Sequence, residues 1–176
     1  MIQIRQGVFE TNSSSTHAIS IAPYTKDIQV PEYFKFSHDR EFGWERATYQ
    51  DAETKAAYLW VAACSQYDSI KNKDTLLRIK AELTRILMEY GVKTVIFQDA
   101  EYVKSKYYDD REYLDINGYI DHSGELDGWV DDLIDEPELV ISYLFNNKSQ
   151  VMTGNDNDDD GVSFTSDAVY TIYKGN

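Results

Sequence analysis

Apolar and polar residues alternate over the first part of the chain, a pattern typical of half-buried β-strands. In the segment HAISIAPY, Ile19 and Ile21 flank a serine, and the proline that follows ends the strand. In EYFKFS, Phe34 and Phe36 fall on the same side of a second strand. The segment 38–50 has no clear period, so we expect it to be a loop.

The period lengthens to three and four residues after residue 50, which indicates helices. Apolar residues over 52–67 predict a first amphipathic helix. A second apolar stripe over 76–90 predicts another, with Asp74 as its N-cap and Gly91 as its C-terminal stop. The β-branched segment Val92–Phe97 follows at once and predicts a strand.

The last third of the chain carries shorter signals. The segments DGWVDDLI (127–134) and PELVISYLF (137–145) predict two short helices, the second opened by a proline. QVMTG (150–154) and AVYTIY (168–173) predict closing strands. The order is mixed, and no repeated strand–helix–strand unit is visible. We therefore expect an α+β fold with an antiparallel or mixed sheet, two main helices on one face, and short acidic helices in the C-terminal half.

Composition agrees with one globular domain over residues 1–176. Apolar residues make up 42% of the chain, and no apolar run reaches the length of a membrane span. The N-terminus has no signal-peptide pattern, so we expect a cytoplasmic protein that does not bind membranes. Cys64 is the only cysteine and lies on an apolar helical face, which predicts a buried thiol and excludes an intrachain disulfide.

The net charge of −14 is confined to one part of the sequence. Residues 1–98 contain 12 acidic and 12 basic side chains, whereas residues 99–176 contain 19 acidic and only 5 basic ones. A field of that sign repels nucleic acid and attracts basic surfaces. Either the acidic half serves solubility, or it binds a protein that normally holds nucleic acid; direct binding to DNA is not expected.

The string ETNSSSTH near the N-terminus is the first candidate site. Its side chains are a carboxylate, hydroxyls, an amide and an imidazole, and they belong to Glu10, Asn12, Ser13, Ser14, Ser15 and His17. Serine, threonine and asparagine stabilise turns by bonding to nearby backbone, so one interpretation is a hydrogen-bonded surface loop. The other is a site that binds a phosphate or nucleotide, or performs acid–base chemistry. No phosphate-binding glycine loop is present.

His122 lies in a second polar setting, YIDHSG. If His17 and His122 meet, they are suited to act as acid and base on a phosphodiester, with Glu10 or Asp121 orienting one ring, or equally to bind a metal. A single surface histidine in a turn is the alternative interpretation.

An aspartate-rich stretch before the last strand partly matches a calcium-binding loop. Oxygen ligands would come from Asp156, Asp158, Asp160 and Asp167, with Gly161 at the turn. The last position is an aspartate, shorter than the usual glutamate, and the flanking segments predict strands where the motif requires helices. A solvated acidic loop is therefore the main expectation, with calcium as the alternative; no other cofactor is expected.

The segment IRQGVFETNSSSTHAISI, residues 4–21, resembles the N-terminal signature of a group of small proteins from phages and mobile elements of low-GC Gram-positive bacteria. The signature runs Gly-x-Phe-Glu-Thr-Asn-Ser-Ser-Ser-x-His. YIDHSG and LFNNKSQVMTGND are similar to later landmarks of the same group, and the rest of the chain is not covered. Some small acidic proteins of such elements inhibit type II-A CRISPR systems. The resemblance thus implies an anti-CRISPR inhibitor of Cas9 or its guide-RNA complex, with Glu10 as the first residue to test.

Two functions are therefore expected from the sequence. The first is an inhibitor that binds a nucleic-acid-binding defence protein through its motif and through acidic residues, namely Asp109, Asp110, Asp131 and Asp132. The alternative is a small hydrolase or nuclease that uses Glu10, His17 and His122. Whether the chain is an enzyme stays open at this point.

Overall fold

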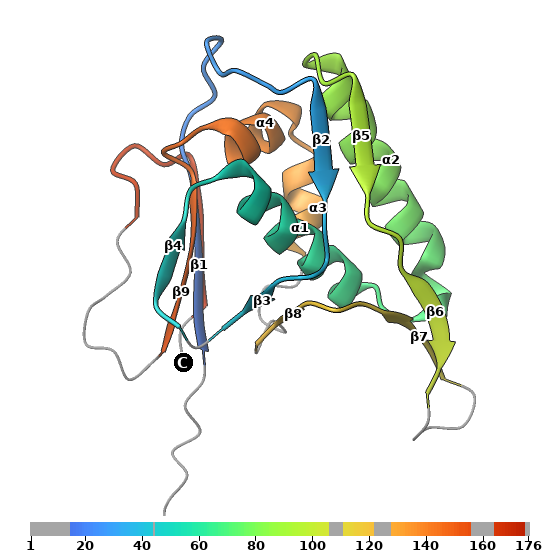
Figure 1. Ribbon diagram of the computed structural model, residues 1–176. Helices are drawn as coiled ribbons and strands as arrows, with labels where there is room; N and C mark the ends of the chain where they lie inside the picture. Colours follow the sequence, from blue (N-terminus) through green and yellow to red (C-terminus); the bar gives the residue numbers. More distant parts are fainter. Residues whose placement is uncertain (1–14, 44, 106–110, 122–127, 156–163, 175–176) are drawn as a thin grey trace, which may run out of the picture.

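The structure, a computed structural model, describes residues 15–43, 45–105, 111–121, 128–155 and 164–174. An antiparallel sheet stands on one side of the molecule, and the helices lie on one face of it (Figure 1). Its strands run in the order β10–β1–β9–β4, with the bounds β1 (Ser15–Ile21), β4 (Ala47–Tyr49), β9 (Gln150–Asn155) and β10 (Tyr170–Lys174).

Strand β1 is an inner strand of this sheet and is covered on both faces. His17 pairs with Thr153 of β9 and with Lys174 of β10. The side chains of Ile19 and Ile21 belong to the hydrophobic core beneath the helices. On the opposite face, the hydroxyl of Ser20 accepts a hydrogen bond from the backbone of the segment before β10. Since both faces are covered, most side chains of β1 are buried, and polar ones among them require internal partners.

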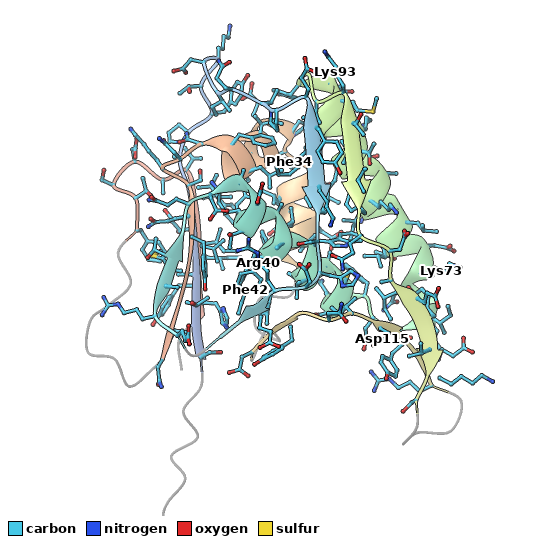
Figure 2. The ribbon with its side chains drawn as sticks, viewed as in Figure 1. Phe34, Arg40, Phe42, Lys73, Lys93 and Asp115 are labelled. Carbon is cyan, nitrogen blue, oxygen red and sulfur yellow. The ribbon has the colours of Figure 1, made fainter. Side chains whose placement is uncertain are left out.

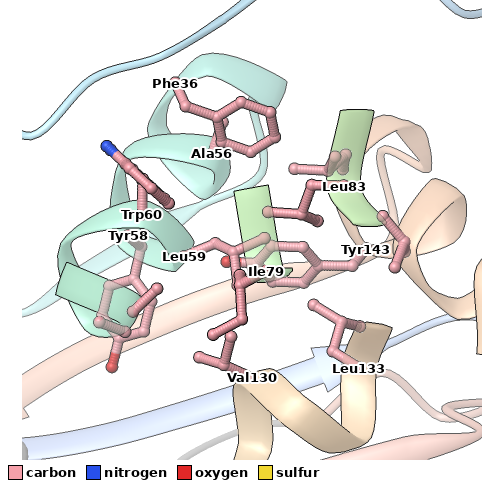
Figure 3. Close-up of a cluster of buried hydrophobic side chains, with 14 of the residues drawn as sticks. Phe36, Ala56, Tyr58, Leu59, Trp60, Ile79, Leu83, Val130, Leu133 and Tyr143 are labelled. Atoms are coloured by element: carbon pink, nitrogen blue, oxygen red, sulfur yellow. The ribbon is translucent and has the colours of Figure 1, made fainter. Parts of the chain in front are cut away.

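Helix α1 (Ala52–Gln66) is the centre of the fold. Asp51 is its N-cap and accepts a hydrogen bond from the backbone of Thr54. The helix contacts the sheet, strand β2 and the other helices, so it is buried on nearly every side rather than along one stripe. Its alanines admit this close packing, and Tyr58, Leu59 and Trp60 fill the spaces between layers (Figure 3). The helix predicted over 52–67 is therefore present, but it is a core helix that is buried on most sides and not an amphipathic one.

Helix α2 (Lys73–Glu89) presents the predicted stripe, with five buried residues: Leu76, Ile79, Leu83, Ile86 and Leu87. Gly91 has φ +107°, and the backbone amides of Gly91 and Val92 bond back to the last turn, which is the Schellman ending expected after residue 90. The predicted N-cap is wrong. The short 3-10 helix η1 (Ile70–Asn72) runs directly into α2, so Asn72 precedes the helix and Asp74 lies in its first turn.

Among the described residues, the other strands form three pairs: β2 (Tyr33–Phe36) with β5 (Thr94–Phe97), β3 (Glu41–Phe42) with β8 (Tyr119–Ile120), and β6 (Glu101–Lys104) with β7 (Glu112–Asp115). The first two pairs are parallel and the third is antiparallel. The expectation of a loop over 38–50 is therefore wrong, because β3 and β4 lie there. Both are too short to show a period in the sequence.

Helices α3 (Trp129–Ile134) and α4 (Pro137–Phe145) confirm the two short C-terminal helices, and the α+β class is confirmed as well. Trp129 is buried against Tyr58 and Tyr143, which fixes α3 to the core. None of the helices in the described part of the chain is long and apolar enough to cross a membrane. Cys64 is buried as predicted, and burial raises the pKa of its thiol to about 12.

Candidate functional site

The described part of the N-terminal motif is the beginning of strand β1. Ser15 is 2% exposed and His17 is fully buried. Since side chains of a strand alternate in direction, Ser15 and His17 lie on the same face and point toward helix α1. The remaining motif residues fall outside the described residues, namely Glu10, Asn12, Ser13 and Ser14.

The imidazole of His17 has a partner at each nitrogen. Nε2 lies 2.7 Å from the carbonyl oxygen of Asp121 and 3.0 Å from the Ser15 hydroxyl, and Nδ1 lies 3.2 Å from the Tyr58 hydroxyl. A carbonyl oxygen only accepts, so Nε2 carries a hydrogen. In the neutral ring Nδ1 is then an acceptor, and the Tyr58 hydroxyl donates to it. Ser15 also donates to the Asp121 carbonyl, over 2.8 Å.

This network connects two sequence landmarks that lie far apart in the chain. Asp121 belongs to YIDHSG, and its backbone carbonyl oxygen accepts hydrogen bonds from both Ser15 and His17 of the ETNSSSTH string. His122 itself lies outside the described residues, so the predicted pair of histidines stays a prediction. A general base needs a lone pair that the substrate can reach. His17 is buried, and its nitrogens are engaged within the protein, which indicates a structural role for this ring.

The pKa of the Tyr58 phenol is raised far above its usual range, because the side chain is completely buried. The hydroxyl therefore stays protonated and remains a donor to His17 at every physiological pH. Phe42 and Trp129 pack against the Tyr58 ring and hold it in place. The geometry is that of a fixed hydrogen bond between helix α1 and strand β1.

The second candidate is the acidic corner, which we define as Asp131, Asp132, Asp135, Glu136 and Glu138 on helices α3 and α4. Asp131 is partly buried, and its carboxylate has polar partners within the chain. It accepts a hydrogen bond from Tyr67 and pairs with Arg78 at 2.6 Å. Asp132 is exposed, with the Tyr170 hydroxyl 3.5 Å away. The two neighbouring aspartates predicted as binding residues thus differ, and Asp132 is the one that faces solvent.

The other three carboxylates of the acidic corner are exposed as well. Asp135, Glu136 and Glu138 make no ion pair with any residue in the described part of the chain. The buried residues Val130, Leu133 and Ile134 hold α3 to the core. The corner therefore presents its charges from a fixed backbone. Asp109 and Asp110, also predicted as binding residues, lie outside the described residues.

A surface hollow of about 420 Å³ adjoins the acidic corner. Its lining includes the carboxylates Glu136 and Glu138 together with Tyr24, Val169 and Tyr170. Val169 is 61% exposed, although it is an aliphatic residue. Burial, and then the charge of Asp132, raise the pKa of Tyr170. The combination of aromatic rings, apolar surface and two carboxylates fits the chemistry of an arginine or lysine side chain.

Of the four predicted calcium ligands, Asp167 lies among the described residues. Asp156, Asp158 and Asp160 lie outside the described residues, whereas Asp167 is exposed and has the Lys148 ammonium 3.9 Å away. Strands β9 and β10 flank the stretch, in place of the two helices of a calcium-binding loop. Within the described ranges, no group of three or more histidine, cysteine or acidic side chains is arranged to hold a metal ion.

Lys55 is a polar residue whose role the sequence did not reveal. It is fully buried, and its ammonium donates to the carbonyl oxygens of Asn146 at 2.9 Å and Ser149 at 3.0 Å. Asn146 is the C-cap of α4, where carbonyl oxygens carry partial negative charge. Desolvation lowers the pKa of Lys55 to about 8, and the charge of Asp51 opposes that shift. A lysine within an alanine-rich helix was the only available signal.

The burial of His38 was likewise not predicted from the sequence. Its ring is buried, Nδ1 accepts the backbone N–H of Asn117, and Nε2 donates to the carbonyl of Asp99. His38 thus connects its own segment to two others that are distant in sequence.

No protein-family model, curated protein or solved structure matches the chain.

Proposed function

We propose that this chain is a non-catalytic binding protein whose acidic corner docks on a basic surface of a nucleic-acid-binding protein. The motif resemblance makes Cas9 or its guide-RNA complex, the target of type II-A anti-CRISPR inhibitors, the partner to test first. The observation that carries the proposal is the set of exposed, unpaired carboxylates on α3 and α4.

Helix stability does not explain all of these carboxylates. Negative side chains stabilise a helix at its N-terminus and destabilise it at its C-terminus. Asp132 and Glu138 lie in first turns, where they are favourable. Asp135 is the C-cap of α3, and Glu136 precedes α4 without making a side-chain cap. The dipole of α4 nevertheless favours a negative charge at Glu136, its N-cap. Asp135 is therefore the position that gains nothing from its own helix, and an intermolecular role accounts for it better.

The charge and the adjoining hollow support a basic partner. A net charge of −14 accelerates encounter with a positive surface and makes association sensitive to salt. Cas9 holds its guide and target in positively charged channels, which carboxylates can occupy in place of phosphates. The hollow beside Glu136 and Glu138 offers a place for one arginine or lysine of the partner to anchor.

The hydrolase alternative receives less support. It needs His17 within reach of a substrate, and His17 is fully buried with Tyr58 and Asp121 at its nitrogens. The binding proposal has no such requirement.

The experiment measures binding of the chain to Cas9, with and without guide RNA, at low and high salt. A variant carrying Asp135→Asn, Glu136→Gln and Glu138→Gln is compared with a matched variant carrying Glu32→Gln, Glu41→Gln and Glu45→Gln, which loses the same charge elsewhere. We expect the first to bind at least tenfold more weakly and the second to bind nearly as wild type. Equal weakening of both variants would reject the corner as the docking surface, and absence of binding at low salt would reject Cas9.

A further inference from the structure

A second hollow, of about 500 Å³, is lined by residues of the two long helices, of the segment 98–100 and of strands β6 and β7. Trp60, Leu76 and Leu114 supply apolar surface, and two lysines, Lys73 and Lys80, stand at its rim. The volume lies within the range of small-molecule sites. The hollow is separate from the acidic corner, and unlike that corner it contains basic side chains.

Two polar atoms beside this hollow are buried without a hydrogen-bond partner among the described residues: the indole Nε1 of Trp60 and the hydroxyl of Tyr102. Trp60 is only 4% exposed, and its nitrogen is turned away from the core cluster (Figure 3). Both residues line the hollow. A buried donor without an acceptor costs free energy, so such groups in a folded protein call for a partner. An indole N–H only donates, and hence requires an acceptor atom.

The lysines add positive charge at the same place. The ammonium of Lys80 lies 5.2 Å from the ring centre of Phe97, and that of Lys73 lies 6.0 Å from the ring centre of Tyr102. Neither ammonium is paired with a carboxylate in the part of the chain that the structure describes. The hollow is lined by these two lysines and by two acidic residues, so its formal charge balances, and the two ammonium groups are its cationic donors. Figure 2 shows Lys73 at the outer side of this region, next to β6.

A further donor comes from Gln98. Gln98 lines the hollow, and since its side-chain carbonyl oxygen accepts the backbone N–H of His38, its amide NH2 is the group left to donate to a ligand. Burial raises the pKa of Tyr102, so its hydroxyl remains protonated and able to donate. Two exposed carboxylates, Asp99 and Glu101, also line the hollow. They oppose a multiply charged anion and so favour a single negative charge with an apolar body.

We propose that this hollow binds a small organic carboxylate with an aromatic or branched apolar group. The carboxylate would accept from Trp60 Nε1 and pair with Lys80 and Lys73, while the apolar group would pack on Leu76 and Leu114. Because the two orphaned atoms are shielded from water, the ligand reaches them when a rim side chain changes rotamer, which a lysine does readily. The proposal does not depend on the function proposed for the acidic corner.

The test uses 3-phenylpropanoate as the probe and its neutral amide as the matched control. Binding is followed by NMR through the indole N–H signal of Trp60, which is assigned with Trp60→Phe. We expect the carboxylate to shift this signal in a saturable manner and the amide to bind at least tenfold more weakly. Phenylalanine, added as a second probe, distinguishes a plain carboxylate from an amino acid, since its ammonium would meet Asp99 and Glu101.

The variants Lys73→Gln and Lys80→Gln test the charge at the rim. Each is expected to weaken binding of 3-phenylpropanoate about tenfold, because each removes a charged donor to the carboxylate. The control Lys26→Gln lies outside the hollow and should bind as wild type. Lys73 is exposed and Lys80 is half-buried, and neither belongs to the hydrophobic core, so these variants are expected to fold. Equal affinity for the acid and the amide, no effect of the rim variants, or no shift of the Trp60 signal would overturn the proposal.

Discussion

The hydroxyl of Tyr58 lies 3.2 Å from Nδ1 of His17, and this contact connects the central helix to an inner strand of the sheet. The other ring nitrogen lies 2.7 Å from the carbonyl of Asp121. His17 therefore joins three segments that are far apart in sequence. Because the side chains of His17 and Tyr58 are fully buried, the loss of one of these hydrogen bonds would leave a polar group in the core short of a partner.

Replacing Tyr58 by phenylalanine removes the donor to His17 and leaves Nδ1 buried without it. We expect the free energy of unfolding to fall by about 1–3 kcal/mol, as is typical for a buried polar group that loses its partner. Urea unfolding followed by circular dichroism measures the change. Tyr33→Phe, at an exposed tyrosine, is the control and should change stability by less than about 0.5 kcal/mol. An unchanged Tyr58→Phe variant would show that the contact contributes nothing.

His17→Gln separates a structural role from a catalytic one. We expect the variant to lose stability and to keep its affinity for the partner when measured well below its unfolding temperature. A hydrolase that used His17 would instead lose turnover on a phosphodiester while the folded state stayed intact. Measuring both the thermal midpoint and the dissociation constant on the same sample distinguishes the two outcomes.

Lys55 makes stability depend on pH. Its pKa is about 8 in the folded chain and about 10.5 in the unfolded chain. Below pH 8 the cost of burying the charge is fully present. Between these two values the unfolded chain binds more protons, so the contribution of Lys55 to stability rises with pH.

The comparison of wild type with Lys55→Met isolates this contribution. We expect the unfolding free energy of wild type, relative to the variant, to increase by up to roughly 3 kcal/mol between pH 7 and the pKa of the unfolded chain. The measurement is urea unfolding at several pH values. Lys26→Met at an exposed site should show a flat difference, and a flat difference for Lys55→Met would contradict a lowered pKa.

Gly118 lies where the chain passes close to its own backbone. A β-carbon at this position would overlap the carbonyl oxygens of Arg40 and His38. We expect Gly118→Ala to destabilise the protein by about 2 kcal/mol or more, since backbone cannot move aside as a side chain can. At Gly154 the nearest atom is the Oγ1 of Thr16, 3.0 Å away, which belongs to a movable side chain. Gly154→Ala should therefore cost less, and thermal unfolding of the two variants compares them.

Asp135 offers a test of whether the acidic corner serves binding or folding. Its carboxylate is at the C-terminal end of α3, so Asp135→Asn should raise the unfolding free energy by about 0.3–1 kcal/mol. The same variant should weaken binding to a basic partner. Asp132→Asn, in the first turn of the same helix, removes the same charge and should lower stability instead. A loss of stability in Asp135→Asn would show that this carboxylate supports the fold.

Local sequence patterns predicted the elements that are long and periodic. The stripe from Leu76 to Leu87 and the stop at Gly91 define helix α2, and Pro137 with the apolar residues after it defines α4. These features depend on neighbours three or four residues apart, so one stretch of sequence contains them. The short strands β3 and β4 have too few residues to show a period, and their pairing partners are distant in the chain.

The sequence by itself determined the α+β class, the two main helices, the segregation of charge and the polar character of the N-terminal motif. Tertiary structure decided the rest. Whether His17 is a reactive group or a buried link depends on Tyr58 and Asp121, which come from other parts of the chain. The same holds for Asp131 and Asp132, which are adjacent and identical in type, yet only Asp131 meets Arg78. Burial and pairing arise when distant segments pack together, and no local pattern contains that information.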